Sequence, residues 1–132
     1  MTVKATVGAI IDKDGKILLT KRNNEPFKDY WCIPGGHIDF GETPEQAIKR
    51  EVKEETCLIV KSLKFSGYYS EIYKEINWHA VALIFICETK GIIKIDPKEV
   101  KAYKWFDKRE ALKQKLAFEH KKILTDYMKN EE

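Results

Sequence analysis

The sequence predicts an α+β fold in which a mixed β-sheet is covered by helices. Three observations predict it: segments rich in β-branched and aromatic residues, amphipathic segments interspersed among them, and no regular alternation of strand and helix. The chain has 132 residues, of which 43% are apolar and 34% are charged. This composition fits one folded domain over residues 1–132, and it excludes a disordered or fibrous chain.

The N-terminal third predicts a hairpin followed by a loop. Residues 3–11 are rich in β-branched residues, the turn sequence Asp-Lys-Asp-Gly follows at 12–15, and residues 16–20 predict the second strand. Residues 21–29 are polar and contain Pro26, which predicts a loop. A short apolar stretch then ends at Pro34-Gly35-Gly36, a strong signal that the chain turns.

Residues 43–56 give the clearest helix. Thr43 suits the N-cap and Pro44 suits the first helical position. Gln46 stands three residues after the cap, which completes a capping box. Three apolar residues recur at helical spacing and are expected to face the core: Ala47, Ile48 and Val52.

The rest of the chain predicts four strands and two closing helices. The strands are expected at 58–60, 65–73, 78–88 and 101–106, and the helices at 107–116, with Asp107 as cap, and at 119–128. Residues 78–88 are almost continuously apolar, which is typical of a covered central strand.

Charge, cysteine content and hydropathy exclude several classes of protein. The 24 basic and 21 acidic residues give a net charge of +3, too small to indicate nucleic acid as a partner. The three cysteines, Cys32, Cys57 and Cys87, lack the spacing of a disulfide scaffold or a zinc site, which favours a reducing compartment. The longest apolar run, 80–87, is too short to cross a membrane. We therefore expect a cytoplasmic protein with no membrane partner.

Three carboxylates lie on one face of the 43–56 helix. Glu51, Glu54 and Glu55 are spaced i, i+3 and i+4, where like charges repel unless something neutralises them. A hard divalent cation such as Mg²⁺ takes carboxylate oxygens and provides that neutralisation. The alternative is a solvated acidic face whose partners are neighbouring cations, here Lys49, Arg50 and Lys53.

A glycine-rich bend leads into the same helix. Gly35 and Gly36, then Gly41, allow a close approach of the backbone to a ligand, and a helix N-terminus attracts anions. The bend and the acidic face therefore predict a site for a phosphate-sized group. We also expect Arg50 to pair with Glu42 and so to hold the loop against the helix.

These residues match a known sequence motif. The run from 36 to 58 is Gly36, five residues, Glu42, seven residues, and then Arg-Glu-Val-Lys-Glu-Glu-Thr-Cys-Leu. It resembles the Nudix box of the Nudix hydrolase family at every fixed position except the last glycine, which is Cys57 here. That glycine normally takes a left-handed cap conformation, so we expect a cost of about 1 kcal/mol at Cys57.

The resemblance implies an enzyme with the Nudix α/β/α sandwich fold. Family members use Mg²⁺ or Mn²⁺ to hydrolyse nucleoside diphosphates linked to another moiety. The resemblance implies that Glu51, Glu54, Glu55 and the carbonyl of Gly36 are metal ligands. It also implies that Glu42 and Arg50 orient the catalytic site. The catalytic base is not fixed by the box, and Glu99 is either that base or a solvated loop carboxylate.

The sequence alone does not identify the substrate. Trp31 and Tyr30 either stack on a nucleobase or fill the core beneath the loop, and His37 beside Gly35 and Gly36 either reaches a phosphate or sugar or is solvated. Residues 116–120, Leu-Ala-Phe-Glu-His, resemble a stretch of ADP-ribose pyrophosphatase-like members, although Tyr73 and Lys74 stand where many of those carry a proline. The short chain also suits family members that hydrolyse a nucleoside triphosphate to the monophosphate and pyrophosphate.

Two other classes of function remain as alternatives. One is a non-catalytic nucleotide-binding sensor of the same fold. The other is an RNA-binding or RNA-processing protein, which would use a lysine-rich surface at Lys113, Lys115, Lys121 and Lys122. These lysines alternate with apolar residues, which favours the interpretation that they lie on the solvent-exposed faces of amphipathic helices. We expect a small-molecule nucleotide as the partner, and either a monomer or a homodimer.

Overall fold

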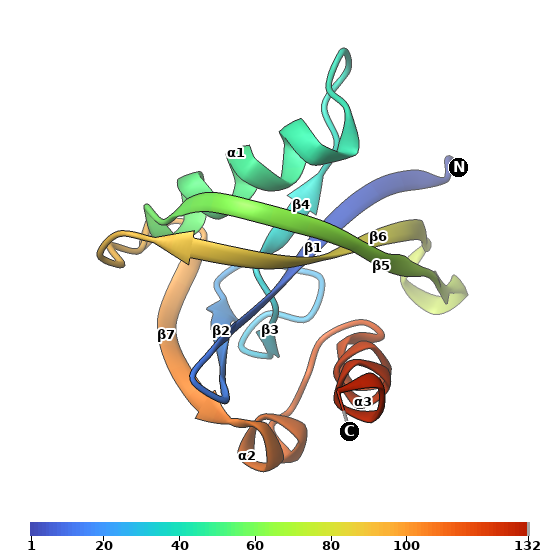
Figure 1. Ribbon diagram of the computed structural model, residues 1–132. Coiled ribbons are helices and arrows are strands. Elements are labelled where there is room, and N and C mark those ends of the chain that lie inside the picture. Colours follow the sequence, from blue (N-terminus) through green and yellow to red (C-terminus); the bar gives the residue numbers. More distant parts are fainter. Residues whose placement is uncertain (132) are drawn as a thin grey trace.

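The chain forms a mixed β-sheet with helices on both of its faces (Figure 1). The computed structural model describes residues 1–131. The elements in chain order are β1 (Lys4–Lys13), β2 (Lys16–Arg22), β3 (Trp31–Cys32), β4 (Gly35–His37), α1 (Pro44–Thr56), β5 (Ile59–Tyr73), the 3-10 helix η1 (Lys74–Ile76), β6 (Trp78–Lys90), β7 (Val100–Asp107), α2 (Lys108–Lys113) and α3 (His120–Asn130).

The strand order is β3-β2-β1-β6-β5, with β4 paired to β1 and β7 paired to β2. β1 and β6 run parallel, from the pair Lys4–Ala80 to the pair Ile11–Cys87, and the other pairs are antiparallel. The mixed sheet predicted from the sequence is therefore confirmed. β6 lies between β1 and β5, which confirms the central position that its apolar run predicted.

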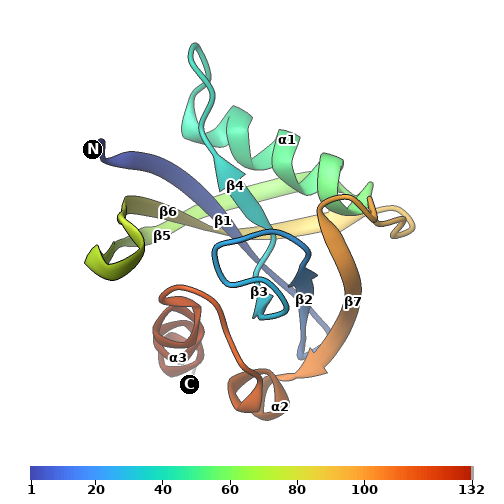
Figure 2. The same cartoon turned by 180° about the vertical axis from the view of Figure 1, so that it is seen from behind.

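The sheet separates two apolar cores because alternate residues of β1 point to opposite faces. Ile10 joins a core with α2 and α3, whereas Ala9 and Ile11 join a second core with α1. α1 lies on one side of the sheet, and α2 and α3 lie on the other, as the view from behind also shows (Figure 2). The α/β/α arrangement is confirmed.

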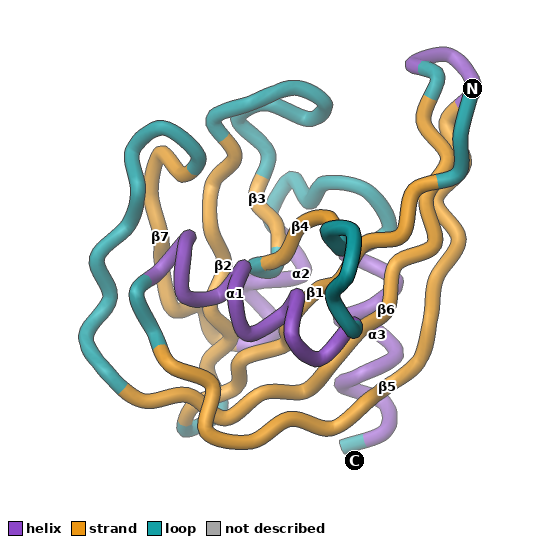
Figure 3. Tube along the Cα trace, turned by 90° about the horizontal axis from the view of Figure 1, so that it is seen from above, coloured by secondary structure: helices purple, strands orange, loops and turns teal. Residues whose placement is uncertain are grey.

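Helix α1 begins as its sequence predicts. The Thr43 hydroxyl accepts the Gln46 backbone N–H at 3.1 Å, and the Gln46 side-chain oxygen accepts the Thr43 backbone N–H at 2.9 Å. This reciprocal capping box satisfies two donors that the first turn leaves free. The three apolar residues assigned to the core face are fully buried: Ala47, Ile48 and Val52. Seen from above, α1 lies across the sheet next to β4 (Figure 3).

Two predictions about element boundaries are wrong. Residues 59–73 form one strand instead of two, because register shifts at Val60/Ser62 and Phe65/Gly67 place bulges where the apolar pattern breaks. The helix after β7 ends at Lys113 instead of 116, and the side chain of Asp107 does not cap it. The next residues pair instead with Trp31, whose backbone carbonyl accepts the Ala117 N–H at 2.8 Å.

The end of α1 carries the strain expected from the sequence. Cys57 has φ 66° and ψ 2°, the left-handed conformation that glycine adopts freely, and its N–H donates to the Lys53 carbonyl at 2.9 Å. Thr56 is buried and its hydroxyl donates to the Val52 carbonyl at 2.7 Å, which fixes the last turn. Within residues 1–131, no helix has the length and hydropathy to cross a membrane.

We expect Cys57→Gly to stabilise the fold by about 0.5–1 kcal/mol, because relief of the left-handed strain exceeds the added entropy of the unfolded chain. Urea unfolding measures this difference. Cys57→Ala removes the thiol but keeps the Cβ atom, so it should give no such gain. Equal stabilities of the glycine and alanine variants would contradict the strain argument.

Candidate active site

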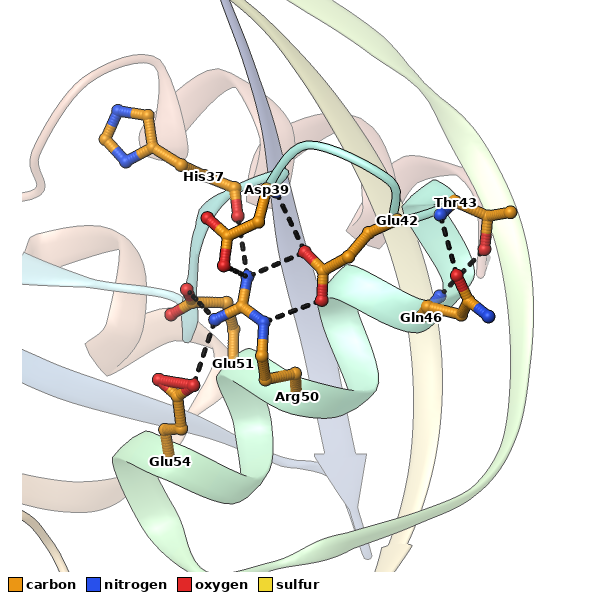
Figure 4. Close-up of polar contacts among 8 residues, drawn as sticks. All are labelled: His37, Asp39, Glu42, Thr43, Gln46, Arg50, Glu51 and Glu54. Carbon is orange, nitrogen blue, oxygen red and sulfur yellow. Dashed lines mark hydrogen bonds and ion pairs between the residues drawn. The ribbon is translucent and has the colours of Figure 1, made fainter.

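The guanidinium of Arg50 joins the loop after β4 to helix α1 (Figure 4). Its Nε and Nη2 atoms donate to the two carboxylate oxygens of Glu42, at 2.7 and 2.9 Å. Nη2 also donates to the His37 carbonyl at 3.0 Å, and Nη1 donates to Glu51 and Glu54 at 2.8 and 3.0 Å. The pairing of Glu42 with Arg50 is therefore confirmed, and it is the bidentate kind that fixes orientation.

Glu42 closes the loop on itself. Its Oε1 atom also accepts the backbone N–H of Asp39, at 2.8 Å. The hydrogen bond from Arg50, followed by that N–H, lowers the pKa of Glu42 to about 2. Phe40 at the tip is exposed, so these polar contacts, and not apolar packing of the tip, fix the loop against the helix.

A second group of carboxylates meets at one wall of a cavity. Oxygens of Glu51, Glu55 and Glu99 all lie within 4.8 Å of one another. Burial raises the pKa of Glu55 well above its ordinary value, and the charges of Glu51 and Glu99 add to this, whereas the Gly35 backbone N–H, 3.0 Å from Oε1, opposes it. Burial also raises the pKa of Glu51. Such a cluster needs positive charge to stay ionised.

The third member of this cluster differs from the one that the box suggested. Glu54 is half-exposed and pairs with Arg50, whereas Glu99 reaches the cluster from the segment before β7. Asn23 holds that segment, because its backbone N–H donates to the Glu99 carbonyl at 3.1 Å. The sequence named Glu99 only as a possible base, since nothing local indicates that it lies beside α1.

The cavity has a volume of about 260 Å³ and is lined by residues from every strand of the sheet except β7, and from α1 and α3. Gly35, Gly36 and His37 form part of its wall, as the glycine bend predicted. A Cβ atom at Gly36 would lie 2.5 Å from the Glu51 carboxylate, and one at Gly35 would lie 2.1 Å from the Val7 carbonyl oxygen. The backbone leaves no room for a Cβ atom at Gly35, whereas one at Gly36 would displace the Glu51 carboxylate. The His37 imidazole points away from Arg50 (Figure 4), and burial lowers its pKa.

Trp31 does not line the cavity, so the structure supports the alternative in which it fills the core. Its ring packs edge-on against Phe106, with centroids 5.1 Å apart, and its backbone pairs with the segment before α3. Tyr30 packs against Phe27 and Lys115 and also lies outside the cavity. The proposed stacking role of Trp31 is not supported by its position.

The aromatic residues of the cavity are Trp78 at the start of β6 and Phe118 before α3, whose ring centroids are 5.2 Å apart. Arg22 at the end of β2 places its guanidinium 5.0 Å from the Phe118 ring and also lines the cavity. The sequence did not assign Trp78 or Arg22 to the site, because only the folded sheet brings them to the cavity from separate strands. Phe118 was noted only within the 116–120 resemblance.

Comparison with known proteins agrees with this geometry. A family model described as the NUDIX domain matches residues 1–127. The chain belongs to the Nudix hydrolase family. The 36–58 run lies within the matched residues, and Arg50 and Glu42 join its loop to its helix.

Relatives of this Nudix domain include an ADP-ribose pyrophosphatase from Methanocaldococcus jannaschii, which is 42% identical over 123 residues. The match covers 93% of this chain and 72% of that protein. A MutT NUDIX hydrolase from Burkholderia pseudomallei has a similar structure, with a TM-score of 0.80, 29% identity, and coverage of 83% and 86% of the two chains. The NUDIX domain of Shewanella oneidensis NrtR shares the fold, with a TM-score of 0.87, 24% identity, and coverage of 100% and 90%.

The ion pair of Glu42 predicts a pH-dependent contribution to stability. Its folded pKa of about 2 lies below its ordinary value of 4.5, so the contribution is complete above that value and is lost as the pH falls towards 2. Glu42→Gln should therefore be less stable than wild type at pH 7, and the difference should shrink by pH 3.

Urea unfolding of both proteins at pH 7, 5 and 3 measures this difference. Glu88→Gln, at an exposed position of β6, is the control and should follow wild type. A stability difference of the same size at pH 7 and pH 3 would contradict the assignment.

Proposed function

We propose that this Nudix hydrolase cleaves a pyrophosphate bond in a nucleoside diphosphate linked to another moiety and releases a nucleoside monophosphate. The observation that carries the proposal is the meeting of Glu51, Glu55 and Glu99 at the cavity wall beside Gly36. Phosphoryl transfer depends on positioning and charge neutralisation more than on covalent help from the protein. The cavity combines acidic groups for a cation with open space for the substrate.

The carboxylate cluster fits Mg²⁺, and it also fits Mn²⁺. Nudix hydrolases generally use divalent metal ions. Hard cations take carboxylate and carbonyl oxygens, and the three carboxylates lie close enough together to share one. The Nudix box also implies Glu54 and the Gly36 carbonyl as metal ligands, and these would contribute further oxygens. When bound, the cation would neutralise charge on the phosphates and on the cluster.

The chain's own residues position the substrate and move the proton. Arg22 provides a positive charge in the cavity for the diphosphate. The oxygen of water adds to one phosphorus, the bridging P–O bond breaks, and its electron pair leaves with the other phosphate. A carboxylate accepts the proton that the water loses. Glu99 suits this role because it is exposed and comes from a separate segment.

ADP-ribose is the first substrate to test, because the relative from Methanocaldococcus jannaschii is named an ADP-ribose pyrophosphatase. A nucleoside triphosphate is the alternative, because a similar structure from Burkholderia pseudomallei is named a MutT hydrolase. Both substrates place a pyrophosphate between a nucleoside and a second group. The carboxylate cluster serves either one in the same way.

Purified protein should release a nucleoside monophosphate from at least one member of a panel of ADP-ribose, nucleoside triphosphates and related diphosphates, with Mg²⁺ or Mn²⁺. Glu55→Gln should lower kcat/KM by at least about 100-fold, because it removes a charge from the cluster. Glu88→Gln is the control and should remain active. No turnover on the whole panel, or full activity of Glu55→Gln, would contradict the proposal, and tight nucleotide binding without turnover would favour a sensor.

Gly36→Ala should weaken Mn²⁺ binding and activity while it leaves the fold intact, because the added Cβ atom displaces a flexible carboxylate. Gly35→Ala is the contrasting variant, since its Cβ atom meets rigid backbone and should lower stability as well. Calorimetric Mn²⁺ titration and urea unfolding measure the two effects. Wild-type Mn²⁺ affinity in Gly36→Ala would contradict the assignment of the metal site.

A further inference from the structure

The cavity has a polar end that the carboxylate cluster does not use. Glu71 on β5 lines the cavity and is only 3% exposed. Its Oε1 atom accepts the indole N–H of Trp78 at 3.3 Å. A buried carboxyl group is costly to maintain, and it has no part in the pyrophosphate chemistry described above. Glu71 therefore lies in a ligand-sized cavity without a role in that chemistry.

Strand register separates Glu71 from the carboxylate cluster. Gly35, which donates to Glu55, pairs with Gly8, and Gly8 pairs with Ile84 of β6. Glu71 pairs with Ala80, which lies four residues from Ile84 on β6. At the rise of a β-strand, four residues span about 13 Å. A nucleotide whose phosphates lie at the cluster can therefore extend its base towards Glu71.

His120 adds a hydrogen-bond donor whose tautomer is fixed by the backbone. Its Nδ1 atom accepts the Ile33 N–H at 3.1 Å, so the neutral ring carries its proton on Nε2. Burial lowers the pKa of His120 to about 3, which keeps the ring neutral. His120 lines the same cavity as Glu71 and Trp78. This end therefore offers an aromatic surface, a fixed donor and a carboxyl group, which suit a nucleobase.

Burial, more than the surrounding charges, keeps the acid form of Glu71 accessible near neutral pH. Burial is the main cause that raises the pKa of Glu71 to about 7. The charge of Glu119 at the start of α3 acts in the same direction, whereas the Trp78 indole, the Glu119 backbone N–H and Arg22 of β2 act against it. His120 stays neutral, and Tyr73 on the same strand is a neutral phenol whose pKa is raised by burial.

We propose that Glu71 binds the edge of the substrate's nucleobase and selects adenine through its acid form. The carboxylic acid donates its O–H to a ring nitrogen of adenine and accepts the 6-amino N–H. The ionised carboxylate has no proton to donate, so its oxygen and the adenine ring nitrogen are both acceptors and repel each other. Guanine retains a partner in both states, because its N1–H and 2-amino N–H are adjacent donors. The inference rests on the proposed function, which makes a nucleotide the ligand.

The test is the ratio of the dissociation constants of AMP and GMP, measured calorimetrically with chelator present at pH 6 and pH 8. In wild type, ionisation of Glu71 should raise the ratio of the AMP constant to the GMP constant at least about tenfold between these pH values. Titration of the ligand phosphate and of His37 affects both nucleotides alike and cancels in the ratio.

Glu71→Gln is the informative variant, because an amide has a donor and an acceptor at every pH. Its ratio should not change between pH 6 and pH 8, and Glu88→Gln should follow wild type. A wild-type ratio that is independent of pH would overturn the inference, as would a ratio that changes equally in Glu71→Gln, or no binding of either nucleotide. The wild-type measurement stands whether or not the variant folds.

These outcomes are separate from those of the hydrolysis panel. The binding experiment contains no divalent metal and requires no turnover. A base preference that depends on Glu71, without hydrolysis of any substrate, would support the inference and contradict the proposed function. Hydrolysis with a base preference that does not depend on Glu71 would support the proposed function and contradict the inference.

Discussion

Arg50 is the contact on which the rest of the site depends. It binds Glu42 in the loop after β4, and it binds Glu51 and Glu54 on its own helix. Loop and helix are therefore held in one arrangement, and the position of Glu51 relative to the glycine bend follows from it. Lysine has the charge but not the planar fork, so it cannot reproduce this geometry. The guanidinium also supplies positive charge beside an acidic cluster that would otherwise repel itself.

The cavity joins two kinds of chemistry along one sheet. At one end, Glu51, Glu55 and Glu99 gather negative charge that suits a cation and, through it, a diphosphate. At the other end, Glu71 and His120 are buried and suit a nucleobase. The parallel pairing of β1 with β6 sets the distance between the two ends. One sheet thus places both groups along the same cavity.

Features determined by a few neighbouring residues were predictable from the sequence. The capping box at Thr43 and the pairing of Glu42 with Arg50 follow from local spacing. The left-handed backbone of Cys57 follows from the resemblance, which places a glycine at that position. Glu99 and Glu71 were not assigned to these positions, because strand pairing brings them to the cavity from distant parts of the chain. Trp31 and Trp78 show the same limit, since only the folded structure shows that Trp31 packs against Phe106 and that Trp78 lines the cavity.

The position of a divalent cation on the protein in solution tests the metal site most directly. Mn²⁺ is paramagnetic and broadens the NMR signals of nearby amides, so substoichiometric Mn²⁺ added to ¹⁵N-labelled protein marks its own binding site. A cation held by the carboxylate cluster should selectively broaden the signals of the residues around it: Gly35, Gly36, Glu51, Glu55 and Glu99. Broadening spread evenly over exposed acidic residues, or centred away from the glycine bend, would contradict this assignment.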